Sequence, residues 1–232
     1  MPAGRWVMRQ SWCDLLFAHW RVPASALRPW IPEVLKIQEF DGSAWLGAVP
    51  FRMSGVMYRP LPDLPWISAF PELNLRTYVE HDGKPGVWFF SLDATNPLAV
   101  WAARRFFHLP YFQAAIQIQE GAQGYSYSSV RREKSLTFRA RYRPTSNVFA
   151  SSPGSLEAFL TEHYCLYAQS PSGPLLRSEV HHAQWPLQHA EAEIHHSDLH
   201  LPHNLPIQGP PELLHFSKHL DVIIWPPQQI AT

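Results

Sequence analysis

The chain has 232 residues with 19 lysines and arginines against 19 aspartates and glutamates, so its formal net charge is zero. A neutral chain without basic runs disfavours nucleic acid and anionic membranes as partners. No run approaches the ~20 apolar residues of a membrane span, and the first residues lack the apolar centre of a signal peptide. Two cysteines, Cys13 and Cys165, make no disulfide framework, and we interpret them as small buried thiols rather than nucleophiles. We therefore expect one cytoplasmic domain over residues 1–232.

Glycine and proline divide the chain into short segments, which favours many strands over long helices. Residues 8–21 fit either a helical stripe or an alternating strand, and we favour the strand. Residues 23–28 predict a short helix that begins at Pro23, because proline suits the first turn of a helix.

The first hairpin is predicted around Asp41-Gly42, which would join residues 35–40 to residues 44–53, because glycine tolerates the positive φ of a tight turn. Both faces of residues 44–53 are apolar, which is typical of a strand in a covered sheet. Residues 57–70 contain three prolines and predict an irregular loop, either a lid over a site or proline-stiffened packing.

A strand with one polar face follows. Four polar side chains alternate with apolar ones: Glu72, Asn74, Arg76 and Tyr78. Asp82-Gly83 predicts a second tight turn, after which residues 87–93 place three apolar side chains on one face: Trp88, Phe90 and Leu92. The polar row faces either the inside of a barrel or solvent. Inside, its charged groups would need partners or a ligand, because an unpaired buried charge is costly.

Two helices are predicted in the middle of the chain. Asn96-Pro97 predicts a helix start, because the Asn side chain accepts a free N–H and proline lacks one where none is needed. This helix would run to about His108 and bury four side chains: Leu98, Trp101, Ala102 and Phe106. Residues 155–168 show the most regular three- and four-residue spacing of apolar side chains and predict the other helix.

Further strands are predicted at residues 111–120, 124–132, 134–142, 175–182, 190–195 and 213–225. This pattern indicates an α+β domain organised on one curved or closed antiparallel sheet.

Motifs of nucleotide binding and serine hydrolysis are absent, since the chain has no P-loop, Gly-x-Gly-x-x-Gly or Gly-x-Ser-x-Gly sequence. Histidines gather between residues 181 and 203. Adjacent histidines on a strand point to opposite faces, whereas a tight zinc site needs three or four converging ligands. We therefore favour solvated or packing histidines over a metal site. His181 or His182, beside Trp185-Pro186, is more informative as a single pocket donor, and we assign His182 to ligand binding.

Segments from nearly the whole chain match one family. They include LLFAHWRVPASALRPWIP, FDGSAWLGAVPFRMSGV, SAFPELNLRTYV, GVWFFSLDATNPLAV, GSLEAFLTEHYCLYA and LHFSKHLDVIIWP. Together they resemble the uncharacterised YqjF-like family, a family of unknown function in the acetoacetate decarboxylase-like superfamily. The resemblance implies a strongly bent antiparallel sheet, closed into a cone-like β-barrel around an internal cavity, with two main flanking helices.

The resemblance also implies where an active site would lie. In acetoacetate decarboxylases an aromatic–x–Glu motif supplies a pocket carboxylate, and Phe70-Pro71-Glu72 is similar to it. A later Gly-Arg-Glu…Phe-Pro-Lys-Lys motif supplies the Schiff-base lysine and its charged neighbour. Residues 103–105 and 109–112 are similar to this motif, with Tyr111 and Phe112 in place of the two lysines. A phenol cannot form the iminium that such decarboxylation needs, so the resemblance implies the fold without that activity.

We expect a cavity that binds a small organic molecule, acidic or aromatic, without a cofactor or metal. The expected catalytic residues are Glu72, Tyr111 and Arg104. The expected ligand-binding residues are Asn74, Arg76, Tyr78, Trp88, Phe90, Phe112 and His182. The alternatives are a sensor that binds without turnover, and a lysine-independent lyase or hydratase-like enzyme with Glu72 and Tyr111 as acid and base. The expected partner is a small molecule, neither nucleic acid nor membrane, and the sequence is compatible with a homo-oligomer.

Overall fold

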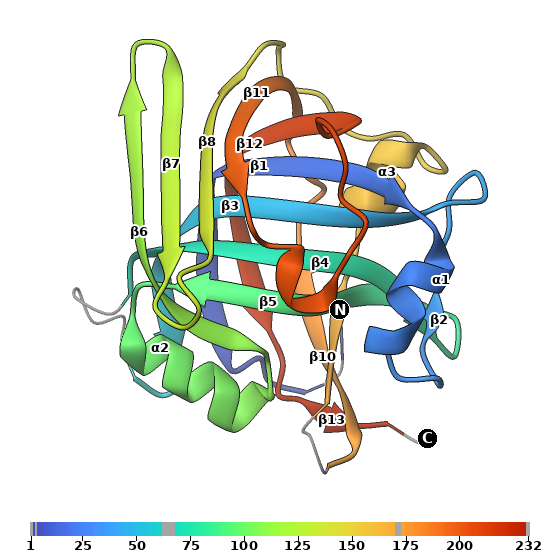
Figure 1. Ribbon diagram of the computed structural model, residues 1–232. Helices are drawn as coiled ribbons and strands as arrows, with labels where there is room; N and C mark the ends of the chain where they lie inside the picture. Colours follow the sequence, from blue (N-terminus) through green and yellow to red (C-terminus); the bar gives the residue numbers. More distant parts are fainter. Residues whose placement is uncertain (1, 3, 62–67, 170–172, 231–232) are drawn as a thin grey trace.

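The computed structural model describes residues 2, 4–61, 68–169 and 173–230. These residues form mostly sheet, with few and short helices (Figure 1). Within the described ranges, no helix combines the length and the hydrophobicity that a membrane crossing requires.

The strands, in chain order, are β1 Met8–Val22, β2 Lys36–Ile37, β3 Ala44–Tyr58, β4 Phe70–His81, β5 Lys84–Ala94, β6 Tyr111–Gly121, β7 Gly124–Arg131, β8 Thr137–Pro144, β9 Cys165–Gln169, β10 Leu175–His182, β11 Gln188–Ser197, β12 Leu213–Ile224 and β13 Gln228–Gln229. The helical segments are α1 Ala24–Leu27, η1 Arg28–Trp30, α2 Pro97–Ala102, η2 Ala103–Phe107, α3 Leu156–Thr161 and η3 Leu201–His203. The strand favoured at residues 8–21 and the short helix after Pro23 are confirmed. Part of the predicted loop at residues 57–70 lies outside the described residues.

The strands pair in the order β13-β10-β9-β5-β6-β7-β8-β11-β12-β1-β3-β4-β2, and β10 also pairs with β12 and β4 with β5. Most neighbours are antiparallel, but β5 runs parallel to both β6 and β9. The prediction of a purely antiparallel sheet is therefore wrong, because the chain crosses over through α2 and through α3 before it returns beside β5. Figure 1 shows β1, β3, β4 and β5 side by side, with β6, β7 and β8 rising at one side of this layer.

The predicted hairpin at Asp41-Gly42 is correct only at its turn. Both turn residues have positive φ, and Phe40 pairs with Ser43 across them. The preceding strand, β2, pairs with β4 through Lys36–Glu80 and Ile37–Val79, not with β3. The reason is that the β3–β4 ladder stops at Thr77, so β2 continues the same edge of β4 beyond it.

The helix predicted at residues 155–168 is wrong in its second half. Ser155 caps α3 through the backbone N–H of Ala158, but residues 165–169 form β9. Gly86 of β5 makes this pairing possible, because a Cβ there would lie 2.7 Å from the Cys165 sulfur. Strand pairing with β5 and β10 therefore overrides the helical spacing.

The helix predicted after Asn96 begins where expected, since the Asn96 side chain accepts hydrogen bonds from the N–H groups of Leu98 and Ala99. Its buried face differs from the prediction. Three side chains that were expected inside are exposed: Leu98, Trp101 and Phe106. Val100 and Phe107 are buried instead, so the face that contains them packs inward and the face with Leu98 and Trp101 is exposed.

The β1–β3–β4 layer has buried side chains on both faces, as predicted for residues 44–53. One apolar cluster contains Leu73 and Leu75 and packs against β6, β7 and β8. A second cluster, which contains Val49, Phe51 and Leu92, lies on the other face. The polar row of β4 belongs to this second side of the layer.

Candidate functional site

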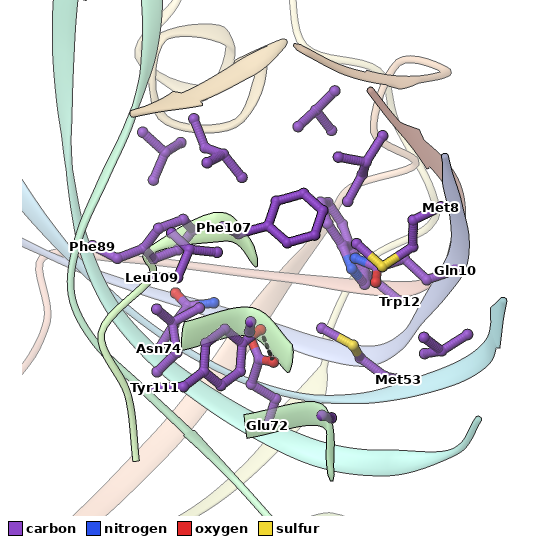
Figure 2. Close-up of a pocket in the computed structure, with 18 of the residues that line it drawn as sticks. Met8, Gln10, Trp12, Met53, Glu72, Asn74, Phe89, Phe107, Leu109 and Tyr111 are labelled. Atoms are coloured by element: carbon purple, nitrogen blue, oxygen red, sulfur yellow. Dashed lines mark hydrogen bonds between the residues drawn. The ribbon is translucent and has the colours of Figure 1, made fainter. Parts of the chain in front are cut away.

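A cavity of about 600 Å³ lies against the polar face of β4. Its lining is mostly apolar, and its polar side chains include Gln10, Glu72, Asn74, Arg76, Tyr111, Thr161, His163 and His182. Figure 2 shows Phe89 and Leu109 on one side of the cavity, and Met8, Gln10 and Trp12 on the other. Three of the four members of the predicted polar row thus face an internal cavity and not solvent.

Glu72 and Tyr111 form the first polar feature of the cavity, which we call the acid pole. The Tyr111 hydroxyl donates a 2.7 Å hydrogen bond to Glu72 Oε2, and Glu72 is only 2% exposed (Figure 2). Burial raises the pKa of Glu72 to about 8, although hydrogen bonds from Tyr111 and Asn74 lower it in part. Burial likewise raises the pKa of Tyr111 well above its usual value. At neutral pH the acid pole is therefore mostly uncharged, with Glu72 protonated.

Arg76 is the second polar feature of the cavity. Arg76 is 8% exposed, and its guanidinium forms no ion pair with any carboxylate among the described residues. Nη2 donates only long hydrogen bonds, 3.4 Å to the Leu160 carbonyl and 3.5 Å to the Tyr78 hydroxyl, and Nε has no partner. Since an arginine stays protonated in proteins, this is a buried positive charge without a counter-ion.

His163 lies on the same side of the cavity as Arg76, and we call these two residues the cation pole. Burial, and then the charge of Arg76, lower the pKa of His163 to about 3. His182 also lines the cavity, and its pKa is lowered by burial. Its Nδ1 donates a 2.7 Å hydrogen bond to the Ala183 carbonyl. Both histidines are therefore neutral at pH 7, and Arg76 supplies the positive charge of this side.

Tyr78, the fourth member of the polar row, does not line the cavity and stands behind it. Its hydroxyl shares a 2.6 Å hydrogen bond with His19 Nε2. Gly47 leaves room for this bond, because a Cβ there would lie 3.0 Å from His19 Nε2 and 3.4 Å from the Tyr78 oxygen. The prediction of Tyr78 as a ligand contact is thus wrong in position, and its observed contacts orient Arg76.

Trp88 and Phe90 are the next correction, since both belong to the opposite apolar cluster. Their neighbours Val87, Phe89 and Leu92 line the cavity instead. The cause is a β-bulge: Leu75 pairs with Ser91 and Arg76 with Phe89, so Phe90 has no partner on β4. The extra residue reverses which side chains of β5 face the cavity, and no local sequence signal predicts the bulge.

Arg104 and Phe112 also lie away from the cavity, although both were predicted for the site. Arg104 is exposed, and its Nε donates to the Tyr111 carbonyl, so it holds the backbone of Tyr111 in place. The Phe112 ring lies 4.1 Å from the Arg131 guanidinium and 5.3 Å from that of Arg104. Adjacent strand residues point to opposite faces, so Tyr111 enters the cavity while Phe112 turns outward.

Sequence reasoning missed several lining residues. Gln10 and Trp12 could have been found from the alternation of β1, and Trp12 stacks on Trp185 with ring centroids 5.6 Å apart. His163 was hidden by the helix predicted through it. The exposed side chains at the cavity's edge are Tyr58, Leu61, Leu98, Trp101 and Phe106, and they mark where it opens to solvent.

Neither a metal centre nor a lysine is found at the cavity. Among the described residues, no group of three or more His, Cys, Asp or Glu side chains could hold a metal ion. The chain has four lysines, and all of them are exposed and outside the described lining: Lys36, Lys84, Lys134 and Lys218. Lys84 pairs with Glu179, and Lys218 with Asp14.

Solved structures with a similar fold include acetoacetate decarboxylase-like proteins. The acetoacetate decarboxylase from Legionella pneumophila has a TM-score of 0.65 at 15% sequence identity, covering 100% of this chain and 92% of that one. An acetoacetate decarboxylase-like enzyme from Sphingomonas wittichii RW1 has a TM-score of 0.67 at 13% identity, covering 99% and 95%. The enduracididine biosynthesis enzyme MppR complexed with pyruvate has a TM-score of 0.67 at 12% identity, covering 100% and 92%. At these identities the likeness establishes the acetoacetate decarboxylase-like fold.

Sequence comparison gives the family. The chain is 45% identical over 227 residues to the uncharacterized protein YqjF of Bacillus subtilis (strain 168), covering 97% of this chain and 93% of that protein. The family DUF2071, described as an uncharacterized conserved protein, matches residues 9–221. The chain therefore belongs to this YqjF-like family, which has the fold of the acetoacetate decarboxylases.

Proposed function

We propose that the cavity binds a small organic acid with an apolar or aromatic body, and that its carboxylate pairs with Arg76. The observation that carries this proposal is the buried, unpaired guanidinium of Arg76 at the cavity wall. A carboxylate would supply the missing counter-charge and accept from the free Nε–H. The other titratable groups of the wall are mostly neutral at pH 7, so the cavity attracts an anion.

The proposal includes a sheet closed into a cone-like barrel around this cavity, with the protein in the cytoplasm. Strand pairings support closure, because they run from β12 through β1, β3, β4, β5, β9 and β10 back to β12. Two free cysteines fit a reducing compartment. The partner is the small molecule, not nucleic acid or a membrane.

Schiff-base decarboxylation is not part of the proposed function. An imine needs a lysine at the substrate, whereas the four lysines are exposed and are not among the described residues that line the cavity. MppR forms a complex with pyruvate, which supports carboxylate binding by this fold without assigning that ligand here. Borohydride treatment in the presence of acetoacetate tests this point: mass spectrometry should find no adduct, and an adduct on any lysine would overturn it.

A second candidate function is acid–base catalysis, as in a lysine-independent lyase or hydratase. The acid pole favours it, because a carboxyl whose pKa is about 8 can both donate and accept a proton near neutral pH. Glu72→Gln separates the two functions. A binding protein keeps its ligand affinity in this variant, whereas an enzyme loses turnover and retains most of its binding.

Binding itself is tested with Arg76→Gln. Calorimetric titration with benzoate and hexanoate should show a loss of roughly tenfold to a hundredfold in affinity, the effect of about 1.5–3 kcal/mol for a hydrogen bond to a charged group. Arg139→Gln is the matched control, since the Arg139 side chain is exposed and forms no hydrogen bond or ion pair with the described residues. Equal affinity of the wild type and Arg76→Gln for both acids would refute the proposal.

A further inference from the structure

The cavity carries its two polar poles at separate places along one strand. Glu72 and Arg76 are both on β4 and four residues apart, and β4 pairs with β3 without any register shift between Phe70 and Thr77. A regular strand rises about 3.3 Å per residue, so their Cα atoms lie about 13 Å apart.

The contacts of the two side chains are also separate. The Arg76 guanidinium contacts Tyr78 and the Leu160 carbonyl, which lie beyond Arg76 in the direction away from Glu72. Its charge acts on His19, His163 and Tyr78. Glu72, in contrast, interacts with Tyr111, Asn74 and Asp93. The groups that interact with the charge of Arg76 are therefore different from those that interact with Glu72.

The pairing of β4 with β5 shows the same separation of the two poles. Arg76 pairs with Phe89 in the middle of β5, whereas Glu72 pairs with Ala94, the last residue of that strand. Tyr111 of the acid pole lies beside Leu92 in the parallel β5–β6 ladder. The acid pole thus belongs to the end of β5 and the cation pole to its middle.

The wall between the poles is apolar apart from one amide. Asn74 stands midway, flanked in the sheet by Val49 on β3 and Leu92 on β5, and all three line the cavity. Phe89 continues this wall toward Arg76. A hydrocarbon chain or an aromatic ring could lie along the side chains of Val49, Leu92 and Phe89, beside the Asn74 amide oxygen, which has no hydrogen-bond partner among the described residues.

Resting on the proposed carboxylate site, we infer that the ligand is an elongated carboxylate with a second polar group at its far end. The carboxylate binds at the cation pole, the apolar body lies along Asn74, Val49 and Leu92, and a hydroxyl or carbonyl group meets Glu72 and Tyr111. An extended chain advances about 1.2 Å per atom, so roughly ten chain atoms span the distance. A three-carbon acid cannot reach both poles.

A series of straight-chain ω-hydroxycarboxylates, from three to about twelve carbons, tests this inference by calorimetric titration. Affinity should rise about threefold to fourfold per added methylene, the ratio that corresponds to about 0.8 kcal/mol per buried CH₂, and should stop rising near ten chain atoms. At the best length, the ω-hydroxy acid should bind severalfold more tightly than the unsubstituted acid, because only it reaches the acid pole.

The double variant Glu72→Leu with Tyr111→Phe removes the acid pole. Replacing both partners of a hydrogen bond with apolar groups of similar shape is nearly neutral for folding, and a thermal melt checks this. The variant should abolish the advantage of the ω-hydroxyl group, so that the ω-hydroxy acid and the unsubstituted acid of the best length bind with equal affinity. The inference is overturned if short acids bind as tightly as long ones, or if the hydroxyl advantage survives. In either case an Arg76-dependent affinity would still support the proposed carboxylate site, whereas its absence would remove that site itself.

Discussion

Two buried arginines of this protein differ in one respect, their counter-ion. Arg131 is 3% exposed, and its Nε donates a 2.8 Å hydrogen bond to Asp93, which is also buried. Arg76 is nearly as buried, but its strand companion Glu72 is far along β4, largely protonated and bonded to Tyr111. Arg131 and Asp93 form a closed ion pair in the interior. Arg76 and Glu72 are kept apart, and both line the cavity.

The largest expected effect comes from opening the closed pair. Asp93→Asn leaves Arg131 buried without a counter-ion and should lower the free energy of unfolding by about 3–5 kcal/mol, measured by urea denaturation. Glu191→Gln is the control, since it opens the exposed Arg143–Glu191 pair and should cost less than about 1 kcal/mol. Equal losses in both variants would mean that the Arg131–Asp93 pair is not the stabilising one.

The next effect is a pH dependence caused by Glu72. Its pKa is about 8 in the folded protein against a usual 4.5, so the folded state holds a proton that the unfolded state has released. This stabilisation is complete below about pH 4.5 and is lost as the pH rises toward 8, with a slope of up to about 1.4 kcal/mol per pH unit.

The difference between the wild type and Glu72→Gln isolates this effect, because the histidines with lowered pKa values contribute equally to both proteins: His19, His163, His182, His203 and His215. Urea denaturation between pH 7 and pH 8 should show the stability of the wild type falling relative to that of Glu72→Gln. Parallel profiles would contradict a protonated Glu72.

Replacing Arg76 should not lower the free energy of unfolding, whereas replacing Arg131 should. Arg76→Gln eliminates a buried charge that has no partner, so the free energy of unfolding should stay unchanged or rise by about 1 kcal/mol. Arg131→Gln, measured in the same way, should destabilise the protein. A loss of stability in Arg76→Gln as large as in Arg131→Gln would show that Arg76 is structural.

The smallest effect concerns the ring beside the closed pair. Phe112→Leu removes the aromatic face 4.1 Å from the Arg131 guanidinium and should cost about 0.5–1 kcal/mol. The affinity for benzoate should not change, because Phe112 points away from the cavity. A weaker affinity in this variant would place Phe112 in the site after all.

Much of the fold could be predicted from local patterns. The alternation of Glu72, Asn74 and Arg76 gave a strand with one polar face, and Asp82-Gly83 gave its turn, because both signals arise from neighbours in sequence. The pairing of β2 with β4 and the strand at Cys165 could not be predicted in this way. Both depend on which edge of the sheet is free, and that is decided by residues far away in the chain.

The site was predictable in part for the same reason. Glu72, Arg76 and Tyr111 were found because polar residues at period two, and one motif position, mark the cavity wall. Phe89 was missed for Phe90 because of the β-bulge, and Leu98 and Trp101 were assigned to the core although they line the cavity's exposed edge. Sequence pattern reports that a side chain is apolar, but it does not report whether its neighbour is another side chain or an empty volume.

The bulge at Phe90 has a consequence for comparing ligand preference among relatives of this chain. Residues before and after position 90 follow opposite parity, so odd-numbered Val87 and Phe89 share the cavity wall with even-numbered Leu92. A relative without the extra residue would keep the same wall, since Arg76 would still face the residue equivalent to Phe89. In the sequence of such a relative, however, the cavity-facing residues would alternate regularly, without the change of parity at position 90. The cavity-lining residues of β5 should therefore be compared between relatives by position on the ladder and not by position in the sequence.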